Sequence, residues 1–360
     1  MKKILVLCPH PENVAPGQRL KYEQYFDHFR MNDIEVHVSP FMTLSFWNIV
    51  YKKGFLIEKI FWTLYGYLKR IIDLFRLRKY DCIYVFLWVT PFGSTFFERI
   101  TSFISKKLIY DIDDLVFLKP ENKINSIAKF FKSEQKSIYL MKKSNHVITC
   151  TPYLDEFVRK YNNNTTDISS TINTAIYQPV NKYTNSCALT IGWSGSFSTS
   201  KYLKLLTTPL KKIQTKYNVK ILVIGDETFH IDGLEIEAKH WSQKSEVSDL
   251  QRIDIGLYPL PNEKWVYGKS GLKALQYMAL GIPTIATKIG ANHRVIENDV
   301  SGFLVDSYKE WEEKLSLLIE NVELRKKMGK KAVERVEHFY SINANKSAYL
   351  NVLKTVLNSK

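Results

Sequence analysis

Short apolar runs alternate with longer helical patterns along this chain, and the alternation starts again near residue 187. The apolar runs are KILVLC, EVHVSP, CIYVFLWV, KLIYDIDD and HVITC, followed by ALTIGWSGS, VKILVIGD, DIGLYPL and GIPTIAT. Helical patterns occur at about 19–31, 200–217, 245–251 and 270–280. Strands that are separated by helices predict βαβ units and parallel sheets. We therefore expect an α/β fold with two doubly wound domains.

A polar stretch, YQPVNKYTNS at 177–186, contains a proline and has no periodicity. This composition is typical of a linker. We expect an N-terminal domain over 1–180, a C-terminal domain over 187–335, and a last helix over 336–360 that packs back toward the N-terminal domain. The length of 360 residues suits two domains, because single cores rarely grow beyond about 250 to 300 residues.

The charge of the chain favours anionic partners. Lys and Arg number 51 and Asp and Glu 36, which gives a formal charge of +15. Zinc-finger spacing, an arginine-rich arm and the motif of an RNA-binding sheet are all missing from the sequence, so no nucleic-acid partner is expected. Among anionic partners, a membrane surface and phosphorylated substrates are therefore favoured. The cysteines at 8, 82, 150 and 187 lack paired spacing, which predicts free thiols. No signal peptide or membrane span is evident in the sequence, so we expect the protein in the cytoplasm.

The first segment that could bind a ligand is TIGWSGSFSTSKYLKLL at 190–206. An apolar strand runs into a loop with Gly192 and Gly195, where backbone N–H groups and a helix N-terminus would attract a diphosphate. The hydroxyls of Ser194, Ser196 and Thr199 can donate to phosphate oxygens. A plain strand-to-helix turn, with Ser198 or Thr199 as N-cap, explains the same pattern equally well.

The second segment, GKSGLKALQYMALGIPTIAT at 268–287, is more specific. Lys269 lies at the entrance of a predicted helix and Lys273 one turn further on, so both charges can face one point. The positive end of the helix disfavours two cations unless an anion binds there, which argues against a merely solvated basic face. Gln276 continues this face and can hydrogen-bond a ribose hydroxyl.

Together these segments resemble the C-terminal domain of family 4 glycosyltransferases, particularly a bacterial branch with the pattern GKxxxKxxQYMAxGxP. The resemblance covers residues 188–310 well and the N-terminal half weakly. It implies a GT-B fold, in which two Rossmann-like domains flank an interdomain cleft. It also implies retaining, metal-independent transfer of a hexose-type sugar from a UDP-, GDP- or dTDP-sugar, without a cofactor.

The sequence departs from the family pattern at the diphosphate site. Gly268 and Gln276 stand where the family has two glutamates, and the first loop has Trp193 and Lys201 where the family has an Arg and a Lys. The resemblance therefore implies that Lys269 neutralises the leaving diphosphate, with Lys273 as the second candidate. We expect the glycines after residue 191 and Lys269 to converge on a single diphosphate pocket.

Two further segments resemble parts of the family's donor site. His240 and Trp241 open a stretch, 240–261, that resembles the lining of the nucleotide base, although Trp241 is slightly better explained as core. Residues 288–306 resemble the family's closing strand and loop, in which Gly290, Ala291 and Asn292 approach the donor. A surface turn is the alternative for Asn292.

In the N-terminal half, YDIDD at 110–114 places three carboxylates at the end of a predicted strand, where open α/β folds bind ligands. Carboxylates this close perturb one another's pKa, which suits proton handling. Since the resemblance implies metal-free chemistry, we interpret Asp113 or Asp114 as orienting or deprotonating the acceptor, with a helix N-cap as the alternative for one of them. Gly17 and Arg19 lie in a loop, 11–19, that resembles the family's N-terminal glycine loop.

From Phe41 to Lys79 the chain is dense in aromatic and aliphatic residues interleaved with Lys and Arg. A basic, aromatic, amphipathic surface fits docking on an anionic membrane and a lipid-linked acceptor. The alternative is that this segment forms core helices of the N-terminal domain. If the segment docks on a membrane, neutralising Lys69, Arg70, Arg76 and Arg78 should abolish liposome binding.

The predicted activity is retaining glycosyl transfer to a glycan or lipid-linked acceptor, in surface polysaccharide or lipopolysaccharide assembly by family analogy. The protein is expected in the cytoplasm, peripheral on the inner face of the cell membrane. A nucleotide-sugar epimerase, a phosphorylase and a catalytically silent binding protein of the same fold remain alternatives.

Overall fold

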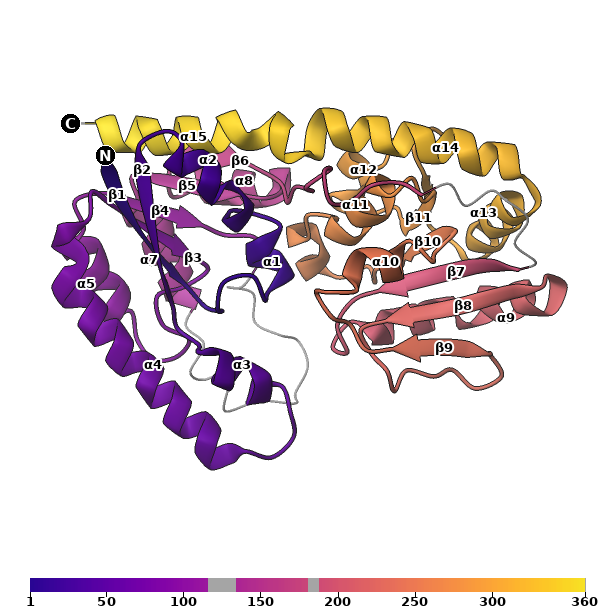
Figure 1. Ribbon diagram of the computed structural model, residues 1–360, viewed down its shortest axis with the longest axis horizontal. Coiled ribbons are helices and arrows are strands. Elements are labelled where there is room, and N and C mark those ends of the chain that lie inside the picture. Colours follow the sequence, from indigo (N-terminus) through magenta and orange to yellow (C-terminus); the bar gives the residue numbers. More distant parts are fainter. Residues whose placement is uncertain (116–133, 181–187, 360) are drawn as a thin grey trace. The chain divides into compact units, whose positions relative to one another are not determined.

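The computed structural model describes residues 1–115, 134–180 and 188–359 (Figure 1). Two compact units make up the chain, the first over 1–169 and 346–360 and the second over 170–345. The expected linker at 177–186 falls partly, and Cys187 wholly, outside the described residues. Each unit contains one six-stranded, all-parallel sheet with helices around it, as the alternation of apolar runs predicted.

The sheet of the first unit has the order β2-β1-β3-β4-β5-β6. Its strands are β1 (Lys2–Cys8), β2 (Ile34–Pro40), β3 (Cys82–Phe86), β4 (Leu108–Asp111), β5 (His146–Thr149) and β6 (Thr165–Asp167). Its helices are α1 (Pro16–Arg19), η1 (Glu23–Tyr25), α2 (Phe26–Arg30), α3 (Leu44–Val50), α4 (Leu56–Arg76), η2 (Leu77–Lys79), α5 (Phe96–Ile104), α7 (Glu134–Lys143), α8 (Pro152–Arg159) and the end of α15 (Ile342–Asn358).

The sheet of the second unit has the order β12-β11-β10-β7-β8-β9. Its strands are β7 (Leu189–Ser194), β8 (Val219–Ile224), β9 (Ile236–Lys239), β10 (Ile255–Tyr258), β11 (Thr284–Thr287) and β12 (Phe303–Val305). Its helices are η4 (Ser200–Leu206), α9 (Thr207–Lys216), α10 (Glu246–Leu250), η5 (Lys264–Gly268), α11 (Leu272–Ala279), α12 (Asn292–Val295), α13 (Tyr308–Glu320), α14 (Val322–Arg335) and the π-helical turn η6 (Val336–Tyr340).

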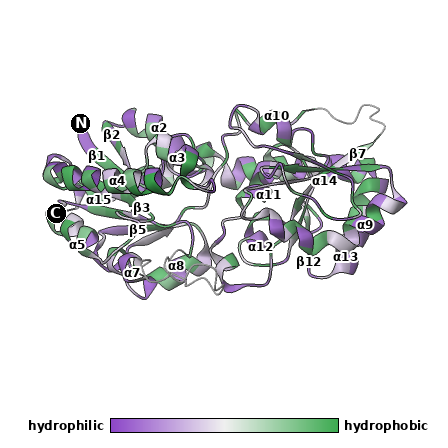
Figure 2. Cartoon of the chain, turned by 90° about the horizontal axis from the view of Figure 1, so that it is seen from below, coloured by the Kyte–Doolittle hydropathy of each residue, from purple (hydrophilic) through white to green (hydrophobic). Residues whose placement is uncertain are grey.

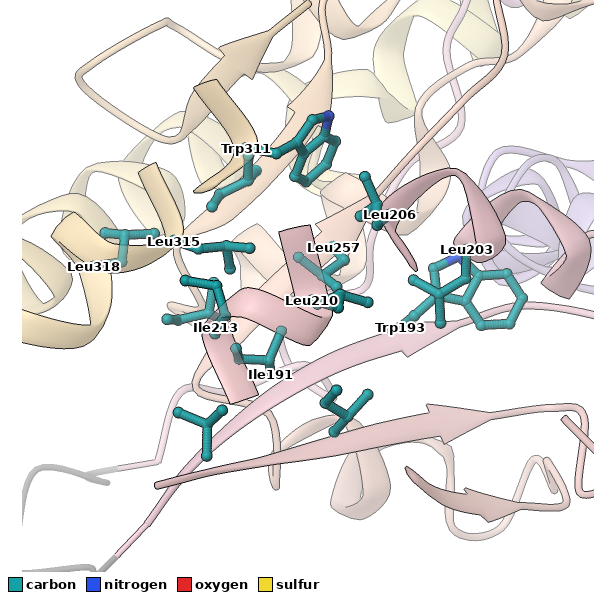
Figure 3. Packing of buried hydrophobic residues seen from close by; sticks show 14 of the residues in the cluster. Ile191, Trp193, Leu203, Leu206, Leu210, Ile213, Leu257, Trp311, Leu315 and Leu318 are labelled. Atoms are coloured by element: carbon teal, nitrogen blue, oxygen red, sulfur yellow. The ribbon is translucent and has the colours of Figure 1, made fainter. Parts of the chain in front are cut away.

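Apolar side chains from the sheet and from α9 and α13 form the core of the second unit (Figure 3). Trp193, at the end of β7, is 1% exposed and belongs to this core. Removing such apolar area from water is the main favourable contribution to folding. The core therefore fixes the carboxyl end of β7, where the first glycine loop begins.

Two predicted helices are divided in the structure. The one at 200–217 consists of η4 and α9, and the one at 19–31 is divided for a clear physical reason. The helix predicted at 19–31 is divided into α1, η1 and α2. Lys21 lies in the interruption, is fully buried, and places its Nζ 2.5 Å from Oδ1 of Asp111 at the end of β4. A buried cation needs such a partner, and this requirement outweighs the local preference for one continuous helix.

The cysteines in the described part of the chain, Cys8, Cys82 and Cys150, are buried free thiols, as expected. Burial raises the pKa of Cys8 and Cys82 to about 12. These thiols are therefore protonated at neutral pH, which makes them poor nucleophiles.

Candidate functional site

The point at which the strand order of the second unit reverses lies between β7 and β10. From β7 the chain proceeds to β8 and β9 on one side, and from β10 to β11 and β12 on the other. Open α/β sheets bind ligands outside the carboxyl ends of their strands at such a reversal. The loops that leave the sheet there are those with Gly195 and with Lys269, the two segments that the sequence singled out.

Gly195 occupies a position with no room for a side chain. A Cβ atom on Gly195 would lie 2.4 Å from the ring of Trp193 and 2.5 Å from Nζ of Lys273. On its other side, Gly225, with φ of +111°, packs directly against the Gly195 carbonyl. Glycine is therefore required at 195, and Lys273 of α11 contacts the loop that follows β7.

The ammonium group of Lys273 lies among aromatic rings and hydroxyl groups. Its Nζ lies 4.4 Å from the ring centroid of Trp193 and 5.8 Å from that of Tyr258, and it donates a 3.3 Å hydrogen bond to Oγ1 of Thr199. Burial, with a smaller contribution from the charge of Lys269, lowers the pKa of Lys273 to about 7. In the described part of the chain, no carboxylate offsets this cost, so the pocket favours an anion.

Lys269 lies nearby but has different neighbours. Its Nζ is 5.6 Å from the ring centroid of Trp265, and Trp265 packs on Tyr202 with ring centroids 5.3 Å apart. Tyr202 belongs to η4 and Trp265 to η5. The two sequence segments thus meet through Lys273 and Thr199. A second contact joins Tyr202 of the first segment to Trp265, just before the second segment, and sequence reasoning did not single out either ring.

The hydroxyl groups of the first loop cluster at its exposed tip. Ser196 Oγ lies 2.8 Å from Ser198 Oγ and 3.3 Å from Thr199 Oγ1, and the Ser196 backbone N–H donates to Thr199 Oγ1 at 3.3 Å. The helix that follows starts as the 3₁₀ segment η4, with no side-chain cap. The loop thus holds several hydrogen-bond donors beside the Lys273 ammonium.

Two predicted donor-binding residues have structural roles. Gly192 lies inside β7, where a Cβ would come 2.3 Å from the side chain of Ile253, so its smallness allows the sheet to pack against that residue. Asn292 is 1% exposed and donates from Nδ2 to the carbonyl of Thr287 at 2.9 Å. It is therefore buried at the start of α12 and does not lie in a surface turn.

Trp241 and Gln276 converge on one buried carboxylate, that of Glu246. Trp241 Nε1 donates to Oε1 at 3.2 Å, and Gln276 Nε2 donates to the same oxygen at 3.1 Å. Tyr177 donates its hydroxyl to Oε2 at 2.8 Å and accepts from Gln276 at 3.0 Å. Glu246 is 4% exposed, and sequence reasoning missed it because one glutamate at the start of a short helix carries no distinctive signal.

Replacing Glu246 with alanine is expected to destabilise the second unit by about 2 to 4 kcal/mol. The change removes a charged acceptor from three donors, of which Tyr177 and Gln276 are buried, and hydrogen bonds to charged groups are worth about 1.5 to 3 kcal/mol each before relaxation. Urea unfolding measures the loss. Glu237→Ala is the matched control, because Glu237 is exposed and pairs with Arg252 at the surface; an equal effect of both changes would contradict a special role for the buried network.

In the first unit, the strand order reverses between β1 and β3, and the loop with Gly17 follows β1. Gly17 lies beside Asp113, since a Cβ on Gly17 would be 3.0 Å from the Asp113 carboxylate. Asp111 is fully buried in its ion pair with Lys21, and Asp114 accepts from the backbone N–H of Leu115 at 2.8 Å. Of the three carboxylates, Asp113 is thus the one that lies beside the glycine loop.

A buried glutamine and glutamate hold the first loop in place. Gln18 is fully buried and exchanges two 3.0 Å hydrogen bonds with the backbone of His10, while it also donates to Glu23 at 2.9 Å. Burial raises the pKa of Glu23, although the charge of Arg19 and hydrogen bonds from Asn13 and Gln18 act in the opposite direction. Burial also lowers the pKa of His10 to about 4, so its imidazole is neutral at pH 7.

Two parallel six-stranded sheets with flanking helices, each with its reversal in strand order, define the GT-B fold. Within this fold, residues 185–335 match the family model Glycosyl transferases group 1.

The chain is also similar to individual known proteins. Over 162 residues it is 26% identical to the capsular polysaccharide biosynthesis glycosyltransferase CapM of Staphylococcus aureus, which covers 42% of each chain. Sucrose-phosphate synthase of Thermosynechococcus elongatus superposes over all of both chains with a TM-score of 0.74 at 15% identity. HepE of Anabaena, in complex with UDP-glucose, superposes over 99% of this chain and all of its own with a TM-score of 0.69 at 16% identity. The chain matches less than half the length of the curated relatives.

Proposed function

We propose that this protein is a retaining glycosyltransferase that moves a sugar from a nucleotide-sugar donor to a glycan or lipid-linked acceptor. The observation that carries the proposal is the contact of Lys273 with the Gly195 loop at the strand reversal of the second unit. A pocket with a partly desolvated ammonium, a second lysine and several hydroxyl groups is suited to a diphosphate. The second unit is accordingly the donor-binding domain.

In this proposal the diphosphate of the donor accepts hydrogen bonds from the hydroxyls of Ser196 and Thr199 and lies against Lys273. Negative charge develops on the diphosphate as the glycosidic bond breaks, and a cation held in place before the reaction stabilises that charge. Lys269 adds a second positive charge. No metal or cofactor has a role in this scheme.

The first unit is proposed to bind the acceptor. Asp113, which lies beside Gly17, orients or deprotonates the acceptor hydroxyl, and Arg19 at the end of α1 contributes a positive charge. Asp114 is the second candidate for the carboxylate. Asp111 has no part in proton transfer, because its carboxylate is committed to Lys21.

The names of similar proteins support a pathway for the proposed activity. CapM is named for capsular polysaccharide biosynthesis, and WaaB, which superposes over 98% of the chain with a TM-score of 0.62, is a lipopolysaccharide outer core galactosyltransferase. We place this protein in cell-surface polysaccharide assembly, on the cytoplasmic face of the membrane. Its formal charge of +15 supports a location at an anionic surface.

Incubation with a panel of UDP-, GDP- and dTDP-sugars tests the proposal. A bound donor raises the apparent melting temperature by mass action, and the donor that does so is then supplied radiolabelled together with lipid-linked and free glycan acceptors. Transfer of label to an acceptor is the expected outcome. Isomerised or phosphorolysed sugar would instead indicate an epimerase or a phosphorylase, and binding without turnover would indicate a silent binding protein.

Donor binding is expected to weaken as the pH rises through about 7. Without a ligand, Lys273 loses its proton near this pH, whereas a bound diphosphate raises its pKa and keeps it charged. Binding above pH 7 must therefore take up a proton, while binding below pH 7 does not. Between pH 6.5 and 8.5 the charged fraction of Lys273 falls about 25-fold, and the Kd for a nucleotide sugar should rise by about the same factor.

Isothermal titration calorimetry in two buffers of different ionisation enthalpy measures both the Kd and the proton uptake. A nucleotide sugar is the right ligand, because its diphosphate diester does not titrate in this range. Lys273→Met is the control and should show no such pH dependence. A wild-type Kd that stays constant from pH 6.5 to 8.5 would contradict the role given to Lys273.

A further inference from the structure

Helix α4 has a polar inner face. The residues that point into the first unit include Gly66, Arg70 and Asp73, which are all buried. Arg70 donates to the backbone carbonyls of Cys8, Ser39 and Val89 and pairs with Asp73 at 2.9 Å. This face is therefore held mainly by hydrogen bonds and an ion pair, and among the apolar residues of α4, Leu74 packs against the core of the unit.

The outer face of α4 is apolar along its whole length. We call this face the α4 stripe; it consists of Ile57, Ile60, Phe61, Leu64, Leu68, Ile71, Ile72 and Phe75, all exposed, with Ile57 at 81% and Phe75 at 85%. At about 100° per residue, these positions fall within an arc about 120° wide, opposite Gly66, Arg70 and Asp73. Figure 2 colours much of α4 as hydrophobic. A soluble helix normally shows the reverse arrangement.

The neighbouring helix α5, which packs on α4, also exposes aromatic side chains, although its Phe97 and Ile104 pack against the core of the unit. Its inner face includes Glu98, fully buried and 3.6 Å from Nζ of Lys136, while Phe96 and Phe103 are 58% and 87% exposed. Both helices lie along the outer side of the first unit in Figure 1. The apolar surface is thus broader than a single helix.

Positive charges border the α4 stripe. Exposed cations lie before α4 at Lys52 and Lys53, and after it at Arg78 and Lys79. Arg76 is 39% exposed even though it pairs with Asp73. Glu58 is the one exposed acid within α4 in the described structure. An apolar surface bordered by cations is complementary to anionic headgroups above an acyl region.

We infer that the α4 stripe, extended by Phe96 and Phe103, docks the protein on an anionic lipid surface with α4 lying parallel to the membrane. Within the described residues, no helix has the length and hydrophobicity that crossing a bilayer requires, so the docking is interfacial. The bordering cations favour lipid over a second copy of this chain, because two copies would place like charges together. Docking needs no donor and no turnover.

Sedimentation of the full chain with vesicles tests the inference. We expect binding to vesicles of phosphatidylcholine with phosphatidylglycerol, and binding at least tenfold weaker to phosphatidylcholine alone. Arg78→Gln and Lys79→Gln should each weaken binding to the anionic vesicles about fivefold, the equivalent of about 1 kcal/mol per cation. The sequence analysis included Arg70 among the cations expected to contact the membrane, and the structure corrects this expectation. Arg70 is buried, so its neutralisation would damage the fold and it is left unchanged.

The decisive variant carries Ile57→Gln, Phe61→Gln and Leu64→Gln, since glutamine favours helix but removes apolar area. Its binding to anionic vesicles should fall more than tenfold, with an unchanged melting temperature and unchanged donor binding. The matched control replaces three exposed apolar residues of the second unit, Leu317, Val322 and Phe339, with glutamine and should bind vesicles as the wild type does.

Two results would overturn the inference. One is wild-type binding to neither kind of vesicle, or equal binding by the triple variant. The other is a dimer in sedimentation velocity that the triple variant dissociates without any change in vesicle binding, which would assign the stripe to self-association. Because vesicle binding is measured without donor, its failure leaves the proposed glycosyl transfer untouched.

Discussion

Replacing Lys273 with methionine is expected to lower kcat/KM for the nucleotide-sugar donor by about 10²- to 10³-fold. The change removes the cation that contacts the Gly195 loop, and the loss of one group that stabilises developing charge costs this much in other enzymes. Methionine keeps most of the volume between the rings of Trp193 and Tyr258. Steady-state kinetics with the donor found in the panel measure the effect.

Loss of folding will not explain this result. The pKa of Lys273 falls from 10.5 to about 7 on folding, so the unfolded chain binds more protons between these values. A charged Lys273 therefore destabilises the fold at neutral pH, and the variant should be at least as stable as the wild type there. Thermal unfolding at pH 7 provides the check.

Lys269→Met shows which of the two lysines contributes more to catalysis. The sequence resemblance ranks Lys269 first, whereas the structure places Lys269 on Trp265 and Lys273 against the Gly195 loop. We expect Lys269→Met to lower kcat/KM by about tenfold, as a more distant charge would. Lys220→Met, at an exposed position of β8, should have no effect. A larger loss at Lys269 than at Lys273 would reverse the assignment.

The sequence predicted the architecture well, because the strands of both sheets are recognisable as apolar runs. Strands buried on two faces read as continuous apolar segments, and their carboxyl ends coincide with the glycine loops. The convergence of the segments at 190–206 and 268–287 follows from that topology alone. It needs no knowledge of side-chain packing.

Individual side chains were harder to predict, because their partners are distant in sequence. Gln276 lies on the expected face of its helix, but its amide donates to Glu246 and Tyr177, 30 and 99 residues away. Lys21 has no local signal at all, and its partner Asp111 is 90 residues further along the chain. A buried polar group must find a partner, yet sequence spacing alone does not say which one.

Helix α4 shows the same limit in a different form. Its apolar and basic residues predicted an amphipathic surface, but the sequence alone did not decide whether the apolar residues lie in the core or on the surface. Arg70 decides the orientation: its guanidinium reaches three backbone carbonyls and Asp73, which places the opposite, apolar face in solvent. Which face of a helix is buried depends on such tertiary contacts.

Gly195→Ala is the second change for which we expect a large effect. Gly195 does not have a positive φ, so alanine is tolerated by the backbone, and the cost arises from space alone. The new methyl group would meet the Trp193 ring at 2.4 Å and Lys273 Nζ at 2.5 Å. Since Trp193 is fixed in the core, the loop must shift away from its ring, and Lys273 must move as well. We expect kcat/KM to fall at least 100-fold.

A double-mutant cycle separates displacement of the lysine from general damage to the loop. If alanine at 195 acts by displacing Lys273, the variant that also carries Lys273→Met should be little worse than either single variant, because the same interaction is lost only once. If the two effects instead multiply, the methyl group harms donor binding independently of the lysine. In that case the clash with Trp193 shifts the loop itself, and displacement of Lys273 does not explain the loss.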